Sequence, residues 1–180
     1  PAPALTKTRT AEITSATLLM GVNRIVVAGV LTTTFSLYLL DLLGETITLG
    51  GWSVGVATLT GLGLGTTTLV SMLAAPLAGR LSDRTGNRWR VASGGLVAGM
   101  AGFGLLALGL PAAIFLALPL VSIGSGSNQG LSTALVGDWA GDGQRSGRSQ
   151  SGRFLGILFT VGDLGSAIGP PLAYALLPLW

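Results

Sequence analysis

The sequence predicts an all-α membrane protein whose chain crosses the bilayer five times. Of its 180 residues 49% are hydrophobic and only 9% are charged, whereas an average soluble domain has about 25% charged residues. The charges are absent from residues 25–40, 46–79 and 91–137. These apolar runs are continuous, while the strands of a membrane barrel would alternate apolar and polar residues. The sequence therefore favours helices over a barrel.

The uncharged runs divide the chain into five predicted helices, because a spanning helix needs about 20 apolar residues. The run over 91–137 is long enough for two helices, with a turn signal at Gly109-Leu110-Pro111. The predicted helices cover residues 23–43, 56–78, 91–108, 112–136 and 154–177. Residues 1–22 are expected to form a cytoplasmic lead-in, with 11–22 lying along the membrane surface. Residues 23–180 then form the transmembrane bundle, and Arg24 reaches back to the interface as an anchor.

This topology places every basic residue on one side of the membrane. The N-terminal arm and the loops over 80–90 and 138–153 share that side with all 10 lysines and arginines of the chain. The opposite loops carry only the acids Asp41 and Glu45. Basic loops stay in the cytoplasm, so the sequence predicts cytoplasmic basic loops in a multi-pass protein of the plasma (inner) membrane.

Several classes of function are disfavoured by the composition. The chain has no cysteine and no histidine, which excludes disulfides and histidine-ligated metals. The glycine-rich stretches at 61–65 and 124–126 lie inside apolar helices, whereas a nucleotide-binding loop needs a strand before it and a helix after it. No nucleophile–base pair or basic nucleic-acid motif is present. We therefore expect no enzyme activity, no cofactor, no metal and no nucleic-acid partner.

The loop between the second and third predicted helices carries a recognisable motif. Residues 79–90 read GRLSDRTGNRWR. This resembles the signature loop of the major facilitator superfamily, in which Gly is followed by three residues, Asp, a basic residue, any residue, Gly and a basic cluster. The matching positions are Gly79, Asp83, Arg84, Gly86 and Arg88. Asn87 and Trp89 depart from the pattern and weaken the basic cluster.

The resemblance covers essentially the whole chain, as five helices of an MFS-type six-helix half bundle. It implies a secondary active transporter that moves a small solute by alternating access. It also implies that Asp83 and its basic neighbours lock the cytoplasmic gate in the outward-facing state. The chain begins without methionine and has no arginine in its fourth helix. We therefore favour the C-terminal half, with the missing helices of the same transporter as partners besides the lipid bilayer.

Three polar residues inside the predicted helices are candidates for coupling or substrate binding. Asp163 lies ten residues after Arg153, about 15 Å into its helix, and is expected to face the bundle interior. Burial favours the neutral form of a carboxyl group, so Asp163 could exchange a proton or bind a cationic substrate. A structural aspartate bonded to Thr160, Ser166 or a neighbouring helix is the alternative. Asn128 and Gln129 are candidates because an unpaired amide in lipid is costly.

The last predicted helix also contains residues that favour packing or bending. Gly165 and Gly169 are four apart, a spacing that lets helices cross closely in lipid. Pro170-Pro171 is expected to bend this helix, either as a fixed kink or as a hinge.

Two other functions are compatible with five apolar helices. One is a non-transporting membrane scaffold or subunit, which would need neither Asp163 nor the signature loop. The other is a small carrier that dimerises to form its pathway. The motif and the intramembrane acid favour the transporter, with a small-molecule substrate and protons as its ligands.

Overall fold

The computed structural model describes residues 7–142 and 151–177, and its long elements are all helical. In chain order the elements are α1 (Lys7–Asn23), the π-helix η1 (Arg24–Leu31), α2 (Thr32–Leu43), β1 (Thr46–Leu49), β2 (Trp52–Gly55), α3 (Val56–Thr85), α4 (Arg88–Ala107), α5 (Pro111–Asp142) and α6 (Ser151–Leu176). Pro111 opens α5 where proline is favoured, since the first turn of a helix needs no N–H donor there.

Five helical segments of the described chain are long and apolar enough to span a membrane. They are Ala11–Leu43, Val56–Thr85, Arg88–Ala107, Pro111–Asp138 and Gly152–Leu176. At about 1.5 Å per residue, 20 helical residues cover the hydrocarbon core of a bilayer. The predicted fold class, an all-α membrane protein with five transmembrane helices, is therefore confirmed.

The first span begins earlier than the sequence predicted. Residues 11–22, expected to lie along the membrane surface, form most of α1 and continue through η1 into α2. Ala16 and Met20 are fully buried and pack in one cluster with Leu135, Val136 and Leu158. Burial of this apolar stripe against α5 and α6 explains why the segment is helical and continuous with the first span. At about 1.5 Å per residue the 33 residues are longer than the hydrocarbon core, so the surface placement of residues 11–22 stays a prediction.

A short hairpin connects α2 to α3, within the loop that the sequence placed between the first and second predicted helices. β1 pairs antiparallel with β2, and Leu49 lies opposite Trp52. The turn consists of Gly50 and Gly51, whose φ angles are 58° and 87°. Two consecutive positive φ values suit the two-residue turns that match the twist of paired strands, and glycine adopts them without a steric penalty.

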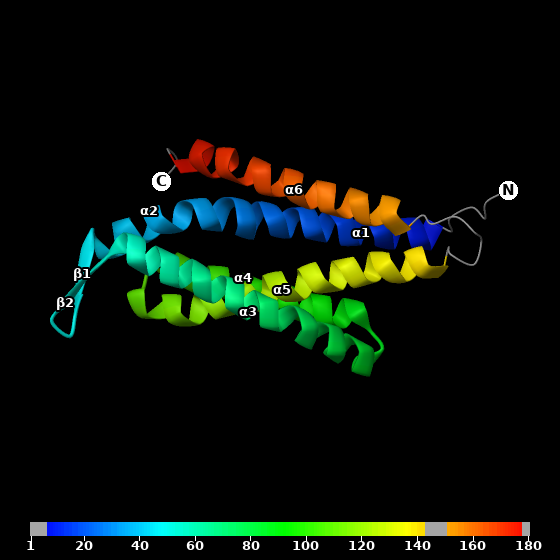
Figure 1. Cartoon of the computed structure of the whole chain (residues 1–180), viewed down its shortest axis with the longest axis horizontal. Helices are drawn as coiled ribbons and strands as arrows, with labels where there is room; N and C mark the ends of the chain where they lie inside the picture. Colours follow the sequence, from blue (N-terminus) through cyan, green and yellow to red (C-terminus); the bar gives the residue numbers. More distant parts are fainter. Residues whose placement is uncertain (1–6, 143–150, 178–180) are drawn as a thin grey trace.

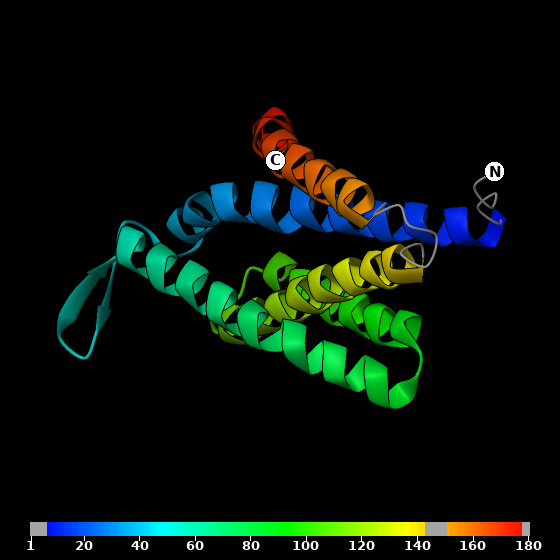
Figure 2. The same cartoon turned by 45° about the vertical axis from the view of Figure 1, so that its right-hand side comes forward.

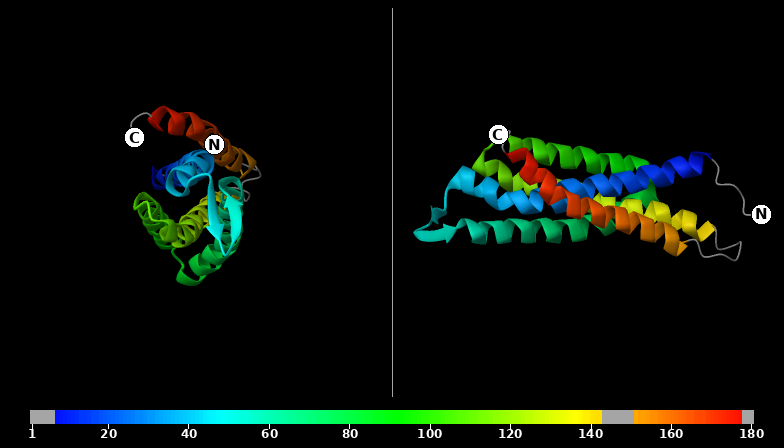
Figure 3. Two further views of the ribbon diagram at one scale, coloured as in Figure 1. Left: turned by 90° about the vertical axis from the view of Figure 1, so that its left-hand side faces the viewer. Right: turned by 90° about the horizontal axis from the view of Figure 1, so that it is seen from above.

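The helix α5 is the centre of the bundle. It packs against α3 and α4 on one side and also contacts α1 and α6. The most apolar stretch of α5 is 44% buried, against 11–22% in the other four spans. Figures 1 and 2 show the first span, formed by α1, η1 and α2, running between α6 and the group of α3, α4 and α5. The end-on view in Figure 3 shows the same order.

Close contact between glycines sets the position of α6 on the first span. A Cβ atom added to Gly29 in η1 would lie 2.5 Å from the Cα of Gly169 in α6. A Cβ added to Gly165 would lie 2.7 Å from the carbonyl oxygen of Gly21. Neither place has room for a side chain, so the two backbones touch directly, as small residues allow in membranes. The helix α6 continues through Pro170 and Pro171.

We expect Gly169→Ala to lower the melting temperature of the detergent-solubilised protein by about 2–8 °C. The added methyl group must push α6 away from η1, and overpacking of this kind costs about 1–3 kcal/mol. Gly156→Ala is the matched control on the same helix, because a Cβ there meets no atom within 4 Å. Equal melting temperatures for the two variants would contradict the close crossing.

Candidate functional site

The signature residues are distributed over the end of one helix and the start of the next. Gly79, Asp83 and Arg84 belong to α3, which continues to Thr85, so most of the predicted loop is helical. Gly86 ends α3 with a φ angle of 62°, a left-handed conformation that favours glycine. The side chain of Asn87 then accepts a hydrogen bond of 3.0 Å from the backbone N–H of Arg90 and caps α4.

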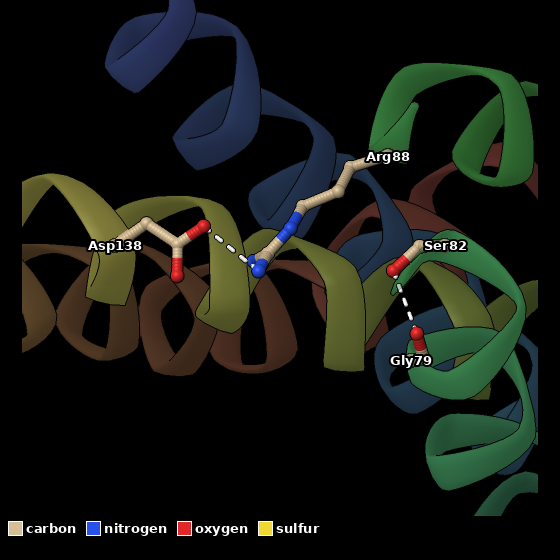
Figure 4. Close-up of polar contacts among 4 residues, drawn as sticks. All are labelled: Gly79, Ser82, Arg88 and Asp138. Atoms are coloured by element: carbon tan, nitrogen blue, oxygen red, sulfur yellow. Dashed lines mark hydrogen bonds and ion pairs between the residues drawn. The ribbon is translucent and has the colours of Figure 1, made fainter. Parts of the chain in front are cut away.

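The two signature glycines have different surroundings. Gly86 needs its positive φ, as described above. Gly79 is an ordinary helical residue, and a Cβ added there would meet no atom within 4 Å. Its carbonyl oxygen accepts a hydrogen bond of 2.8 Å from the buried hydroxyl group of Ser82 (Figure 4). Of the two signature glycines, only Gly86 therefore requires glycine for its backbone conformation.

The ionic contact of this region joins α4 to α5. The guanidinium Nη2 of Arg88 lies 2.8 Å from the carboxylate Oδ2 of Asp138 (Figure 4). The Nη1 of Arg88 is buried and has no hydrogen-bond partner among the described residues. Asp83 and Arg84 are exposed. Sequence reasoning did not single out Asp138, although an acid at the basic end of the fourth helix was a usable signal.

Arg24 lies in the interior of the first long helix rather than at its start, and its place at the membrane interface stays a prediction. It is thirteen residues past Ala11 in a span of 33 residues, because the helix starts well before residue 23. It is also the first residue of the π-helix η1, a rare conformation that is frequent at functional sites. A charged residue is thus placed at the level of Gly162 and Gly165, the eleventh and fourteenth residues of the 25-residue span in α6.

Polar side chains of α5 meet the first span at this level. With the amide of Gln129 oriented so that its oxygen faces Arg24, the Nη2 and Nε groups of Arg24 donate to that oxygen at 2.6 and 3.1 Å. One residue earlier, the amide of Asn23 donates a hydrogen bond of 3.2 Å to the hydroxyl oxygen of Ser125. Since Ser125 and Gln129 are four apart, they share one face of α5.

Asn128 points to a different neighbour from Gln129. It is buried against α4, where a Cβ on Gly95 would lie 3.6 Å from its Oδ1. This oxygen has no hydrogen-bond partner among the described residues. Asn128 also lines a largely apolar pocket of about 170 Å³ between the first span, α4 and α5. The structure brings Gln129 to Arg24 but does not bring Asn128 there.

Asp163 is exposed on α6, whereas the sequence predicted that it faces the interior of the bundle. The buried positions of α6 recur at helical spacing and are Leu158, Gly162, Gly165, Gly169 and Ala173. Asp163 follows Gly162 directly and is turned away from that face by about 100°. Ser166, one of its predicted partners, donates to the carbonyl oxygen of Gly162 instead, at 3.2 Å.

Asp163 and Arg24 nevertheless lie at the same level of the bundle. A Cβ on Gly162 would lie 3.5 Å from the Cγ of Arg24, and one on Gly165 would lie 3.3 Å from its Cβ. These glycines flank Asp163 in the sequence. Among the described residues no ion pair joins the two charges. Two opposite charges thus share one depth but occupy different faces.

The threonines of the spans do not add to this site. Thr33 and Thr34 donate to the carbonyl oxygen of Val30 at 3.0 and 2.9 Å, and Thr32 donates to that of Ala28. Tyr38 donates to the carbonyl oxygen of Leu106 at 2.7 Å and ties α2 to α4. These hydroxyl groups satisfy their hydrogen-bonding needs within or between helices.

The family model of the Major Facilitator Superfamily matches residues 13–180. The chain belongs to this superfamily. It is therefore an integral, multi-pass membrane protein of a transporter family, as its five apolar helices and its signature motif indicate. Comparison with the curated proteins and with the solved structures gave no match.

For this superfamily member we expect the two signature glycines to respond differently to alanine. Gly86→Ala forces a Cβ into a left-handed conformation, which costs about 1–2 kcal/mol, and should lower the melting temperature by about 2–8 °C. Gly79→Ala meets open space in a helix and should leave it unchanged or higher. The reverse order of the two variants in a thermal unfolding assay would contradict the assigned conformations.

We expect Arg88 and Asp138 to couple energetically. The Arg88→Gln and Asp138→Asn variants should each be less stable, and the double variant should be more stable than the sum of the two losses predicts. Because Asp138 is half exposed, the coupling should amount to about 0.5–1 kcal/mol. Thermal unfolding of the four proteins measures it, with Asp41→Asn at the other end of the bundle as the control. Strict additivity would exclude the ion pair.

Proposed function

We propose that this member of the superfamily is a secondary active transporter that moves a small solute by alternating access. The transport is coupled to protons through Asp163. The observation that carries the proposal is the exposed carboxyl group of Asp163 near the middle of a membrane span. A charged side chain at the centre of the bilayer costs roughly 2.5–3.5 kcal/mol, so its face must adjoin water or protein rather than lipid.

The surroundings of Asp163 support a polar pathway along α6. Most exposed positions that share its face at spacings of three and four residues are small or polar, namely Gly156, Thr160, Ala167 and Tyr174, whereas Phe159 is large and apolar. The large aliphatic residues Ile157, Leu164 and Ile168 lie on another exposed face, which suits lipid. The pathway would then run between this bundle and further helices of the transporter, with Pro170 and Pro171 as hinge candidates.

We further propose that the basic end of the bundle is cytoplasmic and that the membrane is the plasma (inner) membrane. The start of α1, the turn between α3 and α4, and the end of α5 lie at the same end of the bundle, as Figures 1 and 3 show. Arg80, Arg84, Arg88 and Arg90 surround that turn. Arg145 and Arg148 lie outside the described residues. Loops rich in arginine remain cytoplasmic.

The signature turn is proposed as part of the cytoplasmic gate. Asp83 and Arg84 are exposed at this end, so their charges are available to helices across the pathway. Arg88 instead forms its ion pair within the bundle. This division supports a gate in which Arg88 and Asp138 hold the turn in place, while Asp83 and Arg84 make the contact that breaks when the gate opens.

Uptake by the full-length protein in proteoliposomes tests the proposal. We expect an imposed proton gradient to drive accumulation of a solute from a screened set of sugars, amino acids, drugs and organic anions. Asp163→Asn should abolish this accumulation, because the amide cannot carry a proton, while exchange of labelled for unlabelled solute should survive. Asp41→Asn is the control, since Asp41 is an exposed acid at the outer end of the first span. Full gradient-driven accumulation by Asp163→Asn would reject the coupling role.

A further inference from the structure

We propose that Arg24 and Gln129 form the binding site for an anionic group of the transported solute, a carboxylate, phosphate or sulfate. This inference rests on the proposed function, since it names the class of solute that the pathway carries. It starts from the position of Arg24 beside Gly162 and Gly165, near the middle of the 25-residue span in α6, where a cation is as costly as an acid. An arginine at that depth needs a partner that repays this cost.

The partner that the structure gives to Arg24 is neutral. With the amide of Gln129 oriented as described above, its oxygen accepts two hydrogen bonds, from Nη2 and Nε. No carboxylate of the described residues forms an ion pair with this guanidinium group. Buried arginines that serve only to tie helices together are usually paired with an acid. A neutral acceptor orients the guanidinium plane but leaves its positive charge uncompensated. The positive charge of Arg24 is therefore compensated only when an anion binds to it.

The geometry of the guanidinium group suits an oxygen anion. Arginine has five N–H donors in a planar fork, and Gln129 engages only the side formed by Nε and Nη2. The remaining donors can hold a carboxylate or phosphate through two parallel hydrogen bonds. The Arg24 side chain is partly exposed rather than buried, so a solute can reach it.

The neighbouring residues support a preformed site. Gly162 and Gly165 of α6 lie against the aliphatic part of Arg24 and leave no room for it to swing in that direction. Asn23 is held by Ser125 one residue earlier. The π-helix begins at Arg24 itself, and such segments are frequent at functional sites. Asp163 lies at the same level but is not paired with Arg24, which keeps both charges available.

Thermal unfolding of the full-length protein in detergent tests this inference with simple anions as probes. Benzoate, acetate, inorganic phosphate and sulfate are each compared with tetraethylammonium chloride at constant ionic strength and pH. At least one anion should raise the melting temperature by about 5 °C or more at a hundredfold excess over its dissociation constant. Arg24→Lys keeps the charge but loses the fork, and should weaken this binding about tenfold or more.

Gln129→Glu is the decisive variant. The new carboxylate would occupy the position that accepts from Nε and Nη2 and would neutralise Arg24 from within. We expect a folded protein, at least as stable as the original, whose melting temperature no longer responds to anions. The melting temperature of Arg24→Gln should also no longer respond to anions. If Arg24→Gln fails to fold, Gln129→Glu alone tests the proposal. Arg80→Gln, which removes an exposed arginine at the end of the bundle, should respond as the original protein does.

Three results would overturn the anion site. They are no stabilisation by any of the four anions, an undiminished response in Gln129→Glu, and stabilisation by the organic cation alone, which would point to Asp163. The transport proposal can be rejected independently of the anion site. Proteoliposomes that accumulate a cation but no anion would keep proton-coupled transport and reject this site. Anion binding that depends on Arg24, in a protein that moves no solute, would support the binding site and reject the transport proposal.

Discussion

The direct contact between the backbones of η1 and α6 determines where the charges of this bundle lie. Gly29 meets Gly169, and Gly165 meets the carbonyl oxygen of Gly21, at distances that exclude any side chain. In lipid no hydrophobic force draws helices together, so such close packing must supply much of the association. Because α6 is fixed in both depth and rotation, Asp163 and Arg24 share one level. The same rotation turns Asp163 away from Arg24 and keeps their charges apart.

The two ends of the bundle use polar residues in different ways. At the basic end, Arg88 and Asp138 pair near water, where an ion pair contributes little to stability but defines how α4 meets α5. Near the middle of the spans, Arg24 meets a neutral amide and Asp163 meets none of its predicted partners. Charges left uncompensated at that depth are costly. In the proposed transporter, a mobile ligand or proton that binds beside these charges would offset this free-energy cost.

The sequence was sufficient for the architecture because hydrocarbon imposes simple rules. Missing charges located the five spans, while the orientation that the arginines indicate stays a prediction. The positions of the site residues depend on the rotation and depth of each helix, which only the packing between helices determines. Residues 11–22 looked like a separate lead-in because they mix polar and apolar residues, whereas the burial of Met20 against α5 and α6 makes them part of one long helix with Arg24 in its interior. Likewise, nothing in the sequence shows that the adjacent side chains of Asn128 and Gln129 point toward different helices.

Arg24 and Asp163 lie at one depth with opposite charges. This gives a physical reason for coupling the movement of an anion to that of a proton without contact between the two side chains. Arg24 and Asp163 carry opposite formal charges, which sum to zero in this layer of the bundle when no solute is present. A bound monoanion on Arg24 would add one negative charge to a region of low dielectric constant, where charge is poorly screened. Protonation of Asp163 would restore neutrality. An anion and a proton would therefore move together through the layer more cheaply than either would alone, which is the energetic requirement for coupled transport.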